Sequence, residues 1–236
     1  MTSIRTSARL GLGLALALLL GACATTRGEM SLAVPANDAA PATLATPAID
    51  DADAGATRVA VIERVSDRRQ FEENPRDPSI PSLKKGSDYA LDAEGRKRAI
   101  ARKRNGYGMA MGDILLEGEE TVETLARGLV ESGLRERGYR ILAAGEPVPA
   151  DALKLQVDIN EFWAWFSPGF WSVSMEAKMK IRFDVTDAVG SRRFEVSAYG
   201  INKGQSGREA NWRLAYDRAF EDYLVKQRNS FSAKQL

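Results

Sequence analysis

The most informative absence in this chain is histidine, since none of the 236 residues is one. Ser-His-Asp and Cys-His triads are therefore excluded, as are zinc sites that combine histidine with cysteine. The commonest general base near neutral pH is also missing. Carboxylate-only chemistry, as in glycoside hydrolysis, and calcium or magnesium sites built from oxygen ligands stay open. The sequence also lacks a Walker A loop, an EF-hand and a GxGxxG motif. We expect no enzyme, no catalytic residues, no metal and no cofactor.

Cysteine is nearly absent too, because Cys23 is the only one. Arg5 and Arg9 form a short basic region before an apolar run from Leu10 to Leu20, and small residues then lead to Cys23. This order is typical of a secretory signal. The run has only about half of the roughly 20 apolar residues that a transmembrane helix needs. Its ending, Leu20-Gly21-Ala22-Cys23, resembles the lipobox of bacterial lipoproteins.

The lipobox resemblance implies that residues 1–22 are a signal peptide, that Cys23 carries the lipid, and that the protein is tethered to a bacterial membrane. Ala24 follows the cysteine, whereas an aspartate there would resemble the signal for retention in the inner membrane. We therefore expect the outer membrane, on its periplasmic face. With Cys23 lipidated, no thiol remains for a disulfide in that oxidising compartment, so stability must come from a packed core.

An excess of charge of one sign is lacking as well. The chain has 33 basic and 32 acidic side chains, and without Arg5 and Arg9 the basic count falls to 31. No global field would attract nucleic acid, and we expect no nucleic-acid partner.

Large apolar residues are few between the anchor and the rest of the chain. Residues 23–56 are rich in Ala, Thr, Pro and Asp, and such a composition cannot bury enough surface to offset the entropy of ordering. We read this segment as a flexible tether with a reach of roughly 30 Å. Residues 57–230 have the length of a single periplasmic domain. Within it, prolines and glycines punctuate residues 70–118, which predicts a long irregular loop.

The rest of the domain shows clear periodicity. Helical spacing of apolar residues predicts helices at 119–137 and 207–228, and Gly138 fits a left-handed cap of the first. Apolar and polar residues alternate along successive strands that we place at 153–160, 172–185 and 192–201, after shorter strands at 58–65 and 139–142. Alternation predicts a sheet with one buried face. We therefore expect an α+β fold: a two-layer sandwich whose mostly antiparallel sheet, a meander, carries two helices on one face.

A basic stretch lies inside the predicted loop. Residues 94–104 hold six positive charges and one negative charge. Guanidinium forks beside glycine amides can hold a phosphate or a carboxylate, so loop 96–108 is a candidate site for an anionic lipid or glycan. The alternative is a solvated basic loop. The candidate ligand-binding residues are Arg96, Lys97, Arg98, Arg102, Lys103 and Arg104.

An aromatic hairpin is the second candidate. Residues 162–171 contain six aromatic side chains around a Ser-Pro-Gly turn. Exposed aromatics at a turn indicate a protein interface or a contact with the membrane interface, and the alternative is an aromatic end of the core. The candidate partner-binding residues are Trp163, Trp165, Phe166, Phe170 and Trp171. A third motif, Asp67-Arg68-Arg69 at a strand end, can provide an active-site carboxylate or, more commonly, a turn cap with a salt bridge.

Together these features resemble the YajG-type family of bacterial lipoproteins. The likeness rests on the lipobox, the strand 59–65 with Asp67-Arg68, the stretch 104–108, the helix 121–137 ending in Arg137-Gly138-Tyr139, and the meander. This family implies no established reaction and no catalytic residues.

Three functions remain open. The first is a non-enzymatic outer-membrane lipoprotein that binds an envelope protein partner or supports envelope assembly. The second is a periplasmic module that binds an anionic lipid or glycan through loop 96–108. The third is a carboxylate-based cell-wall hydrolase, which needs two carboxylates about 5–10 Å apart.

Overall fold

A computed structural model describes residues 27–35, 58–73, 75–83, 92–105, 107, 109–169, 172–204 and 206–236 of the chain. This part contains eight strands and three helices. The strands are β1 (Gly28–Met30), β2 (Val59–Asp67), β3 (Ala99–Arg104), β4 (Ala110–Leu116), β5 (Arg140–Ile141), β6 (Leu153–Pro168), β7 (Val173–Asp187) and β8 (Gly190–Gly204). The helices are α2 (Ala93–Arg98), α3 (Val122–Glu136) and α4 (Glu209–Ala233).

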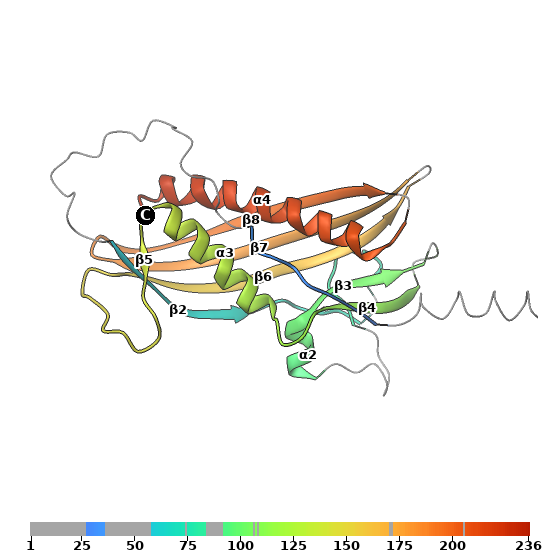
Figure 1. The fold of residues 1–236 in the computed structure, drawn as a ribbon, viewed down its shortest axis with the longest axis horizontal. Coiled ribbons are helices and arrows are strands. Elements are labelled where there is room, and N and C mark those ends of the chain that lie inside the picture. Colours follow the sequence, from blue (N-terminus) through green and yellow to red (C-terminus); the bar gives the residue numbers. More distant parts are fainter. Residues whose placement is uncertain are drawn as a thin grey trace, which may run out of the picture.

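The three longest strands, β6, β7 and β8, form an antiparallel meander (Figure 1). The turn between β7 and β8 closes because the Asp187 carboxylate accepts hydrogen bonds from the amides of Val189 and Gly190. Gly190 has φ 135°, which a side chain would disfavour. On its other side β6 pairs in parallel with β2 and, at Ala164, with β3. The predicted α+β fold with a mostly antiparallel sheet is confirmed, and the sheet does not close into a barrel.

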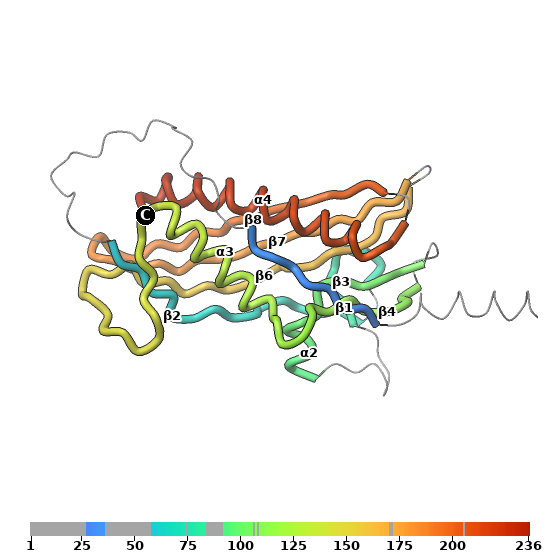
Figure 2. The backbone as a smooth tube through the Cα atoms, viewed as in Figure 1, coloured from blue at the N-terminus to red at the C-terminus, as the bar shows by residue number. Residues whose placement is uncertain are grey.

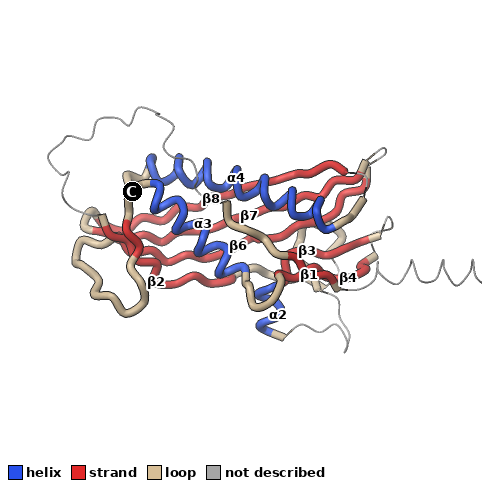
Figure 3. The backbone as a smooth tube through the Cα atoms, viewed as in Figure 1, coloured by secondary structure: helices blue, strands red, loops and turns tan. Residues whose placement is uncertain are grey.

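Both longer helices lie on one face of the sheet (Figure 3). α3 begins at Thr121, whose hydroxyl accepts from the Thr124 amide while the Thr124 hydroxyl accepts from the Thr121 amide. This reciprocal cap satisfies two donors at the first turn. The helix ends before Gly138, which takes φ 80° and confirms the predicted left-handed cap. The buried stripe of α3 is Val122, Leu125, Ala126, Leu129, Val130 and Leu134.

α4 lies unusually close to β8. A Cβ added to Gly200 would stand 2.1 Å from the Ala215 carbonyl oxygen, so only glycine fits there. Side chains of the helix also bond the outer edge of the strand, since Asp222 accepts from the Tyr199 amide and Arg218 donates to the Ile201 carbonyl. These contacts cover backbone groups that an edge strand otherwise exposes.

The segment 70–118 is not the irregular loop that its glycines and prolines predict. It contains α2, β3 and β4, and β3 pairs antiparallel with β4. The strand forms because Ala99, Ile100 and Ala101 are fully buried, and because Arg102 lies opposite Asp113 on β4. Helix α2 begins where the Asp92 carboxylate accepts from the Gly95 amide.

The predicted tether also needs correction. β1 pairs in parallel with β4, with Gly28 opposite Ile114, as Figure 2 shows. Met30 and Leu32 are 1% and 2% exposed, so these two side chains belong to the core. The sequence does not reveal this short strand, because only two apolar side chains, Met30 and Leu32, attach it to the core. The signal peptide, Cys23 and tether positions 24–26 and 36–56 lie outside the described residues.

A second, smaller apolar cluster lies on the opposite face of the sheet. It consists of Ala99, Leu115, Trp163 and Trp165. Phe71 and Leu83, from the segment that follows β2, cover it. Within the described part of the chain, no helix is both long and apolar enough to cross a membrane.

Candidate functional site

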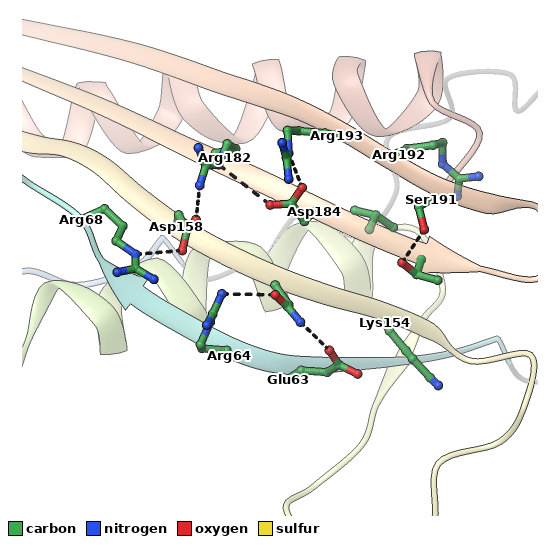
Figure 4. Close-up of a pocket in the computed structure, with 13 residues that line it drawn as sticks. Glu63, Arg64, Arg68, Lys154, Asp158, Arg182, Asp184, Ser191, Arg192 and Arg193 are labelled. Carbon is green, nitrogen blue, oxygen red and sulfur yellow. Dashed lines mark hydrogen bonds and ion pairs between the residues drawn. The ribbon is translucent and has the colours of Figure 1, made fainter.

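The open face of the sheet, opposite α3 and α4, carries a charged groove of about 780 Å³ (Figure 4). The strands β2, β6, β7 and β8 build it, because polar residues that alternate with their core residues, such as Gln156, Asp158 and Asp184, point to this face. Its charged side chains outnumber all others. The six cations are Arg64, Arg68, Lys154, Arg182, Arg192 and Arg193, and the three acids are Glu63, Asp158 and Asp184.

Asp158 is the buried centre of the charged groove, with a side chain only 7% exposed. It accepts a hydrogen bond from Arg182, and the Nε of Arg68 stands 3.5 Å from its Oδ1. Arg182 continues to Asp184 at 3.9 Å, and Arg193 bonds that second carboxylate. Two guanidinium groups thus face each of these carboxylates, which compensates the cost of burying charge.

The other end of the charged groove is less neutralised. Arg64 donates to the Gln156 side chain at 3.2 Å, and Gln156 donates onward to Glu63 at 3.2 Å. Neither Arg64 nor Lys154 forms an ion pair with any described residue. The groove therefore keeps two cations without an ion pair, Arg64 and Lys154, beside a network that orients the other charges, while Arg192 pairs with Asp187 next to it.

The charged groove does not offer two unpaired carboxylates of the kind that a carboxylate-based hydrolase needs, since Asp158 and Asp184 each face guanidinium groups. Beside it, burial alone would raise the pKa of Asp187, but hydrogen bonds from Arg192 and two turn amides hold that pKa below its usual value. A low pKa favours the ionised form and opposes a general acid role. Among the described residues, no cluster of three or more acidic side chains could hold a metal ion.

The predicted basic loop is a helix end and a strand, so its cations are dispersed. Lys97 bonds Glu94 at 3.0 Å, and Arg98 bonds Glu29 at 2.6 Å. Arg102 is 3% exposed and lies 3.5 Å from the buried carboxylate of Asp113. Burial lowers the pKa of Arg102, while Asp113 raises it. The backbone carbonyl of Arg96 accepts a hydrogen bond from the Arg69 guanidinium, and Arg96 is exposed. Ligand binding by these residues stays a prediction.

The aromatic hairpin is split between the two faces of the sheet. Trp163 is fully buried in the second cluster, where it meets Phe71 edge to face at 5.9 Å and donates to the Pro78 carbonyl. Trp165 is 9% exposed on the same side. Phe166 packs against the main core on the helix side. Phe170 and Trp171 lie outside the described residues. Little of either tryptophan is available to a partner, and the predicted role is untested.

A second, smaller hollow unites parts of both predicted segments. This basic pocket, of about 360 Å³, is lined by Lys103, Arg104, Met111, Phe166, Ser206, Gly207, Arg208 and Trp212. Its first two residues come from the basic stretch, and Phe166 comes from the aromatic hairpin. Sequence reasoning missed Met111, Arg208 and Trp212, because only the fold brings the start of α4 to the ends of β3 and β6.

The motif Asp67-Arg68-Arg69 serves the structure and the charged groove. Arg69 makes a two-pronged ion pair with Asp67, at 2.9 and 2.7 Å. The Arg69 side chain is fully buried, whereas Arg68 reaches the groove. The turn-and-salt-bridge interpretation fits this geometry.

No model of a known protein family matches this sequence, and no curated protein sequence matches it either. Three solved structures resemble the fold weakly. An uncharacterised protein shares 8% identity and a TM-score of 0.33, over 75% of this chain and 93% of that one. A DUF330 protein from Xanthomonas campestris shares 13% and 0.32, over 89% and 99%. A protein from Caulobacter crescentus, described as a candidate lipoprotein, shares 18% and 0.30, over 47% and 78%.

These identities and TM-scores are too low to carry an argument, so no conclusion about function rests on the three structures. The resemblance to YajG-type lipoproteins stays a prediction from the sequence.

Proposed function

We propose that this chain is a non-enzymatic lipoprotein that is anchored through Cys23 to the periplasmic face of the outer membrane and binds an envelope protein in the charged groove. The order of residues 1–22 and the ending at Cys23 support the anchor, and Ala24 supports the outer membrane. We place the partner surface in the charged groove and not at the aromatic hairpin, because Trp163 and Trp165 are buried.

One observation carries the partner proposal: the charged groove lies on the sheet face that α3 and α4 leave uncovered (Figure 4). It combines two cations without an ion pair, Arg64 and Lys154, with ion pairs that fix the directions of the other arginines. Oriented charges of this kind give specificity and a faster encounter more than raw affinity. We therefore expect a partner that offers an acidic segment.

Two features argue against catalysis. The chain has no histidine, and the carboxylates of Asp158 and Asp184 are held by arginines. A groove that pairs its acids with guanidinium groups is suited to recognition, because the ion pairs hold its charged side chains in fixed directions.

The test is photo-crosslinking in living cells from position 186, where Thr186 lies exposed on the wall of the charged groove. We expect capture of one defined envelope protein. Reversing the two cations without ion pairs, by Arg64→Glu and Lys154→Glu, should reduce that capture about tenfold, because each lost charge contact weakens binding by about 0.5–1 kcal/mol.

The matched control is a chain with Arg76→Glu and Lys234→Glu, which changes the net charge equally at exposed positions outside the groove. Its capture should equal that of the parent chain. Equal losses in both double variants would show a general charge effect, and no capture at position 186 would refute the groove as the partner surface.

A further inference from the structure

We infer that the basic pocket binds the phosphate head group of an anionic phospholipid in the membrane to which Cys23 anchors the chain. This inference rests on the proposed lipid anchor, and it adds a second, independent binding site to the partner surface. It draws on three observations: the make-up of the pocket, the state of its cations, and the point at which the chain enters the sheet.

The basic pocket has apolar walls and a cationic rim. Met111, Phe166 and Trp212 form the walls. Trp212 is held in place, since its indole donates to the Gly207 carbonyl at 3.2 Å and its side chain is 1% exposed. No acidic residue lines the pocket. A volume of about 360 Å³ is at the lower end of ligand pockets, enough for a head group and the adjoining glycerol region.

Three cations surround this space: Lys103, Arg104 and Arg208. Lys103 and Arg208 form no ion pair with any described residue. Arg104 donates to the Ser82 hydroxyl at 3.2 Å, and burial lowers the pKa of its guanidinium. The first acid of α4, Glu209, bonds Arg213 instead of the rim. Guanidinium groups match phosphate geometry and hold it by charge-assisted hydrogen bonds.

The path of the chain brings the lipid anchor to this end of the domain. β1 runs parallel to β4, so Gly28 lies at the end of β1 that faces the turn between β3 and β4. A Cβ on Gly28 would stand 3.0 Å from the Lys103 amine, which places that entry point beside the pocket rim. Cys23 precedes Gly28 by five positions, and five residues span at most roughly 18 Å. An acylated Cys23 therefore holds the basic pocket close to the head groups.

The turn between β3 and β4 exposes side chains that suit contact with the same membrane surface. Tyr107 is 92% exposed and Met109 is 62% exposed, two large apolar side chains at the tip that precedes β4. Tyrosine favours the membrane–water interface because one end of its ring is apolar and the other is polar. Exposed apolar residues next to a cationic rim fit an anionic bilayer surface in both respects.

The test exploits the cysteine content of the chain. With Cys23 acylated, no other cysteine remains, so Ser206→Cys places a single bimane label at the pocket. The full-length acylated protein is reconstituted in vesicles of four parts phosphatidylcholine to one part phosphatidylglycerol, with either lipid brominated at the same mole fraction. We expect brominated phosphatidylglycerol to quench the label at least twofold more than brominated phosphatidylcholine.

Two variants and one control position locate the effect. Lys103→Glu with Arg208→Glu should abolish the preference for phosphatidylglycerol, and the glutamine pair should reduce it, with unchanged circular dichroism showing that both fold. A label at Val189→Cys, 84% exposed in the turn at the other end of β7, should be quenched by neither lipid. Equal quenching by both lipids, or a preference that survives charge reversal, would overturn the inference.

A free anion is the remaining source of the same chemistry. Inorganic phosphate, added without vesicles, should leave the Ser206→Cys label unchanged. A saturable shift of the label, together with loss of quenching by phosphatidylglycerol when phosphate is added to the vesicle sample, would assign the pocket to free phosphate and overturn the inference. The anchor is tested separately by flotation in high salt. Failure of the chain to float would contradict the proposed lipid anchor. Flotation without selective quenching would contradict only the proposed lipid site in the basic pocket.

Discussion

Arg69 should be among the most costly residues to replace, because it joins three segments from a fully buried position. Its guanidinium donates to the Asp67 carboxylate and to the carbonyls of Ala99 at 2.5 Å, Phe162 at 3.0 Å and Arg96 at 2.8 Å. It thereby ties the end of β2 to β3 and β6. The Asp67 side chain is 11% exposed, so losing the arginine would leave a nearly buried carboxylate without its counter-ion.

We expect Arg69→Met to reduce the free energy of unfolding by about 3–5 kcal/mol, the cost of removing one partner of a buried ion pair. Urea denaturation followed by circular dichroism measures this change. The neighbouring substitution Arg68→Met is the control. Arg68 is 55% exposed and 3.5 Å from Asp158, so its loss should cost less than about 1 kcal/mol. Equal costs for the two substitutions would refute the reasoning.

A double-mutant cycle separates the ion pair from the carbonyl contacts. Asp67→Asn with Arg69→Met removes both charges, so its cost should be clearly smaller than the sum of the two single costs. Additive costs would mean that the carbonyl contacts of Arg69, and not its pairing with Asp67, hold the segments together.

Three further predictions concern the helix layer and its edge. Gln227 is fully buried with neither amide atom bonded, so Gln227→Leu should raise the free energy of unfolding by about 1 kcal/mol, measured by urea denaturation. Gly200→Ala should lower it by about 1–3 kcal/mol, because the new methyl group would overlap the Ala215 carbonyl oxygen; an unchanged midpoint would refute the close approach of α4. Burial, and then the hydrogen bond to Glu176, raises the pKa of Tyr199 to about 12. The folded state keeps this proton longer than the unfolded state, so its contribution to stability is present below about pH 10 and is lost as pH rises towards 12. Burial also raises the pKa of Tyr216 and Tyr223, so the ultraviolet titration of Tyr199→Phe is compared with that of the parent chain and should lack one phenol that titrates near pH 12.

Elements with local signals were predicted well. The helix expected at 119–137 is α3, because apolar spacing and the glycine at 138 mark it without reference to the rest of the chain. The alternating strands of the meander were predicted for the same reason. β3 and β4 were not, because their cations and glycines are typical of a loop, and the strands that flank this hairpin, β6 and β1, come from distant parts of the sequence. The charge of Arg102 is tolerated in a buried strand only because Asp113 lies opposite it on β4.

The charged groove shows the same division between local and non-local information. Alternation placed Lys154, Asp158 and Arg182 on the polar face of their strands, but it could not show that β2 brings Arg64 and Arg68 beside them. Sequence spacing records which face a residue takes within a strand. It does not record which strands become neighbours when the pairing is parallel and the connection is long.

The two candidate sites lie at opposite ends of β7, which constrains how the protein works. The charged groove includes Asp184 and Thr186 near the end of that strand, while the basic pocket includes Phe166, which pairs with Met175 near the start of the strand at Val173. Asp184 lies eleven residues after Val173, and this length of strand spans roughly 36 Å. If β1 holds the pocket at the head groups, a partner in the groove approaches from the periplasm about that far from the membrane. Lipid binding and partner binding then need not compete, because the core of the sheet keeps the two surfaces apart.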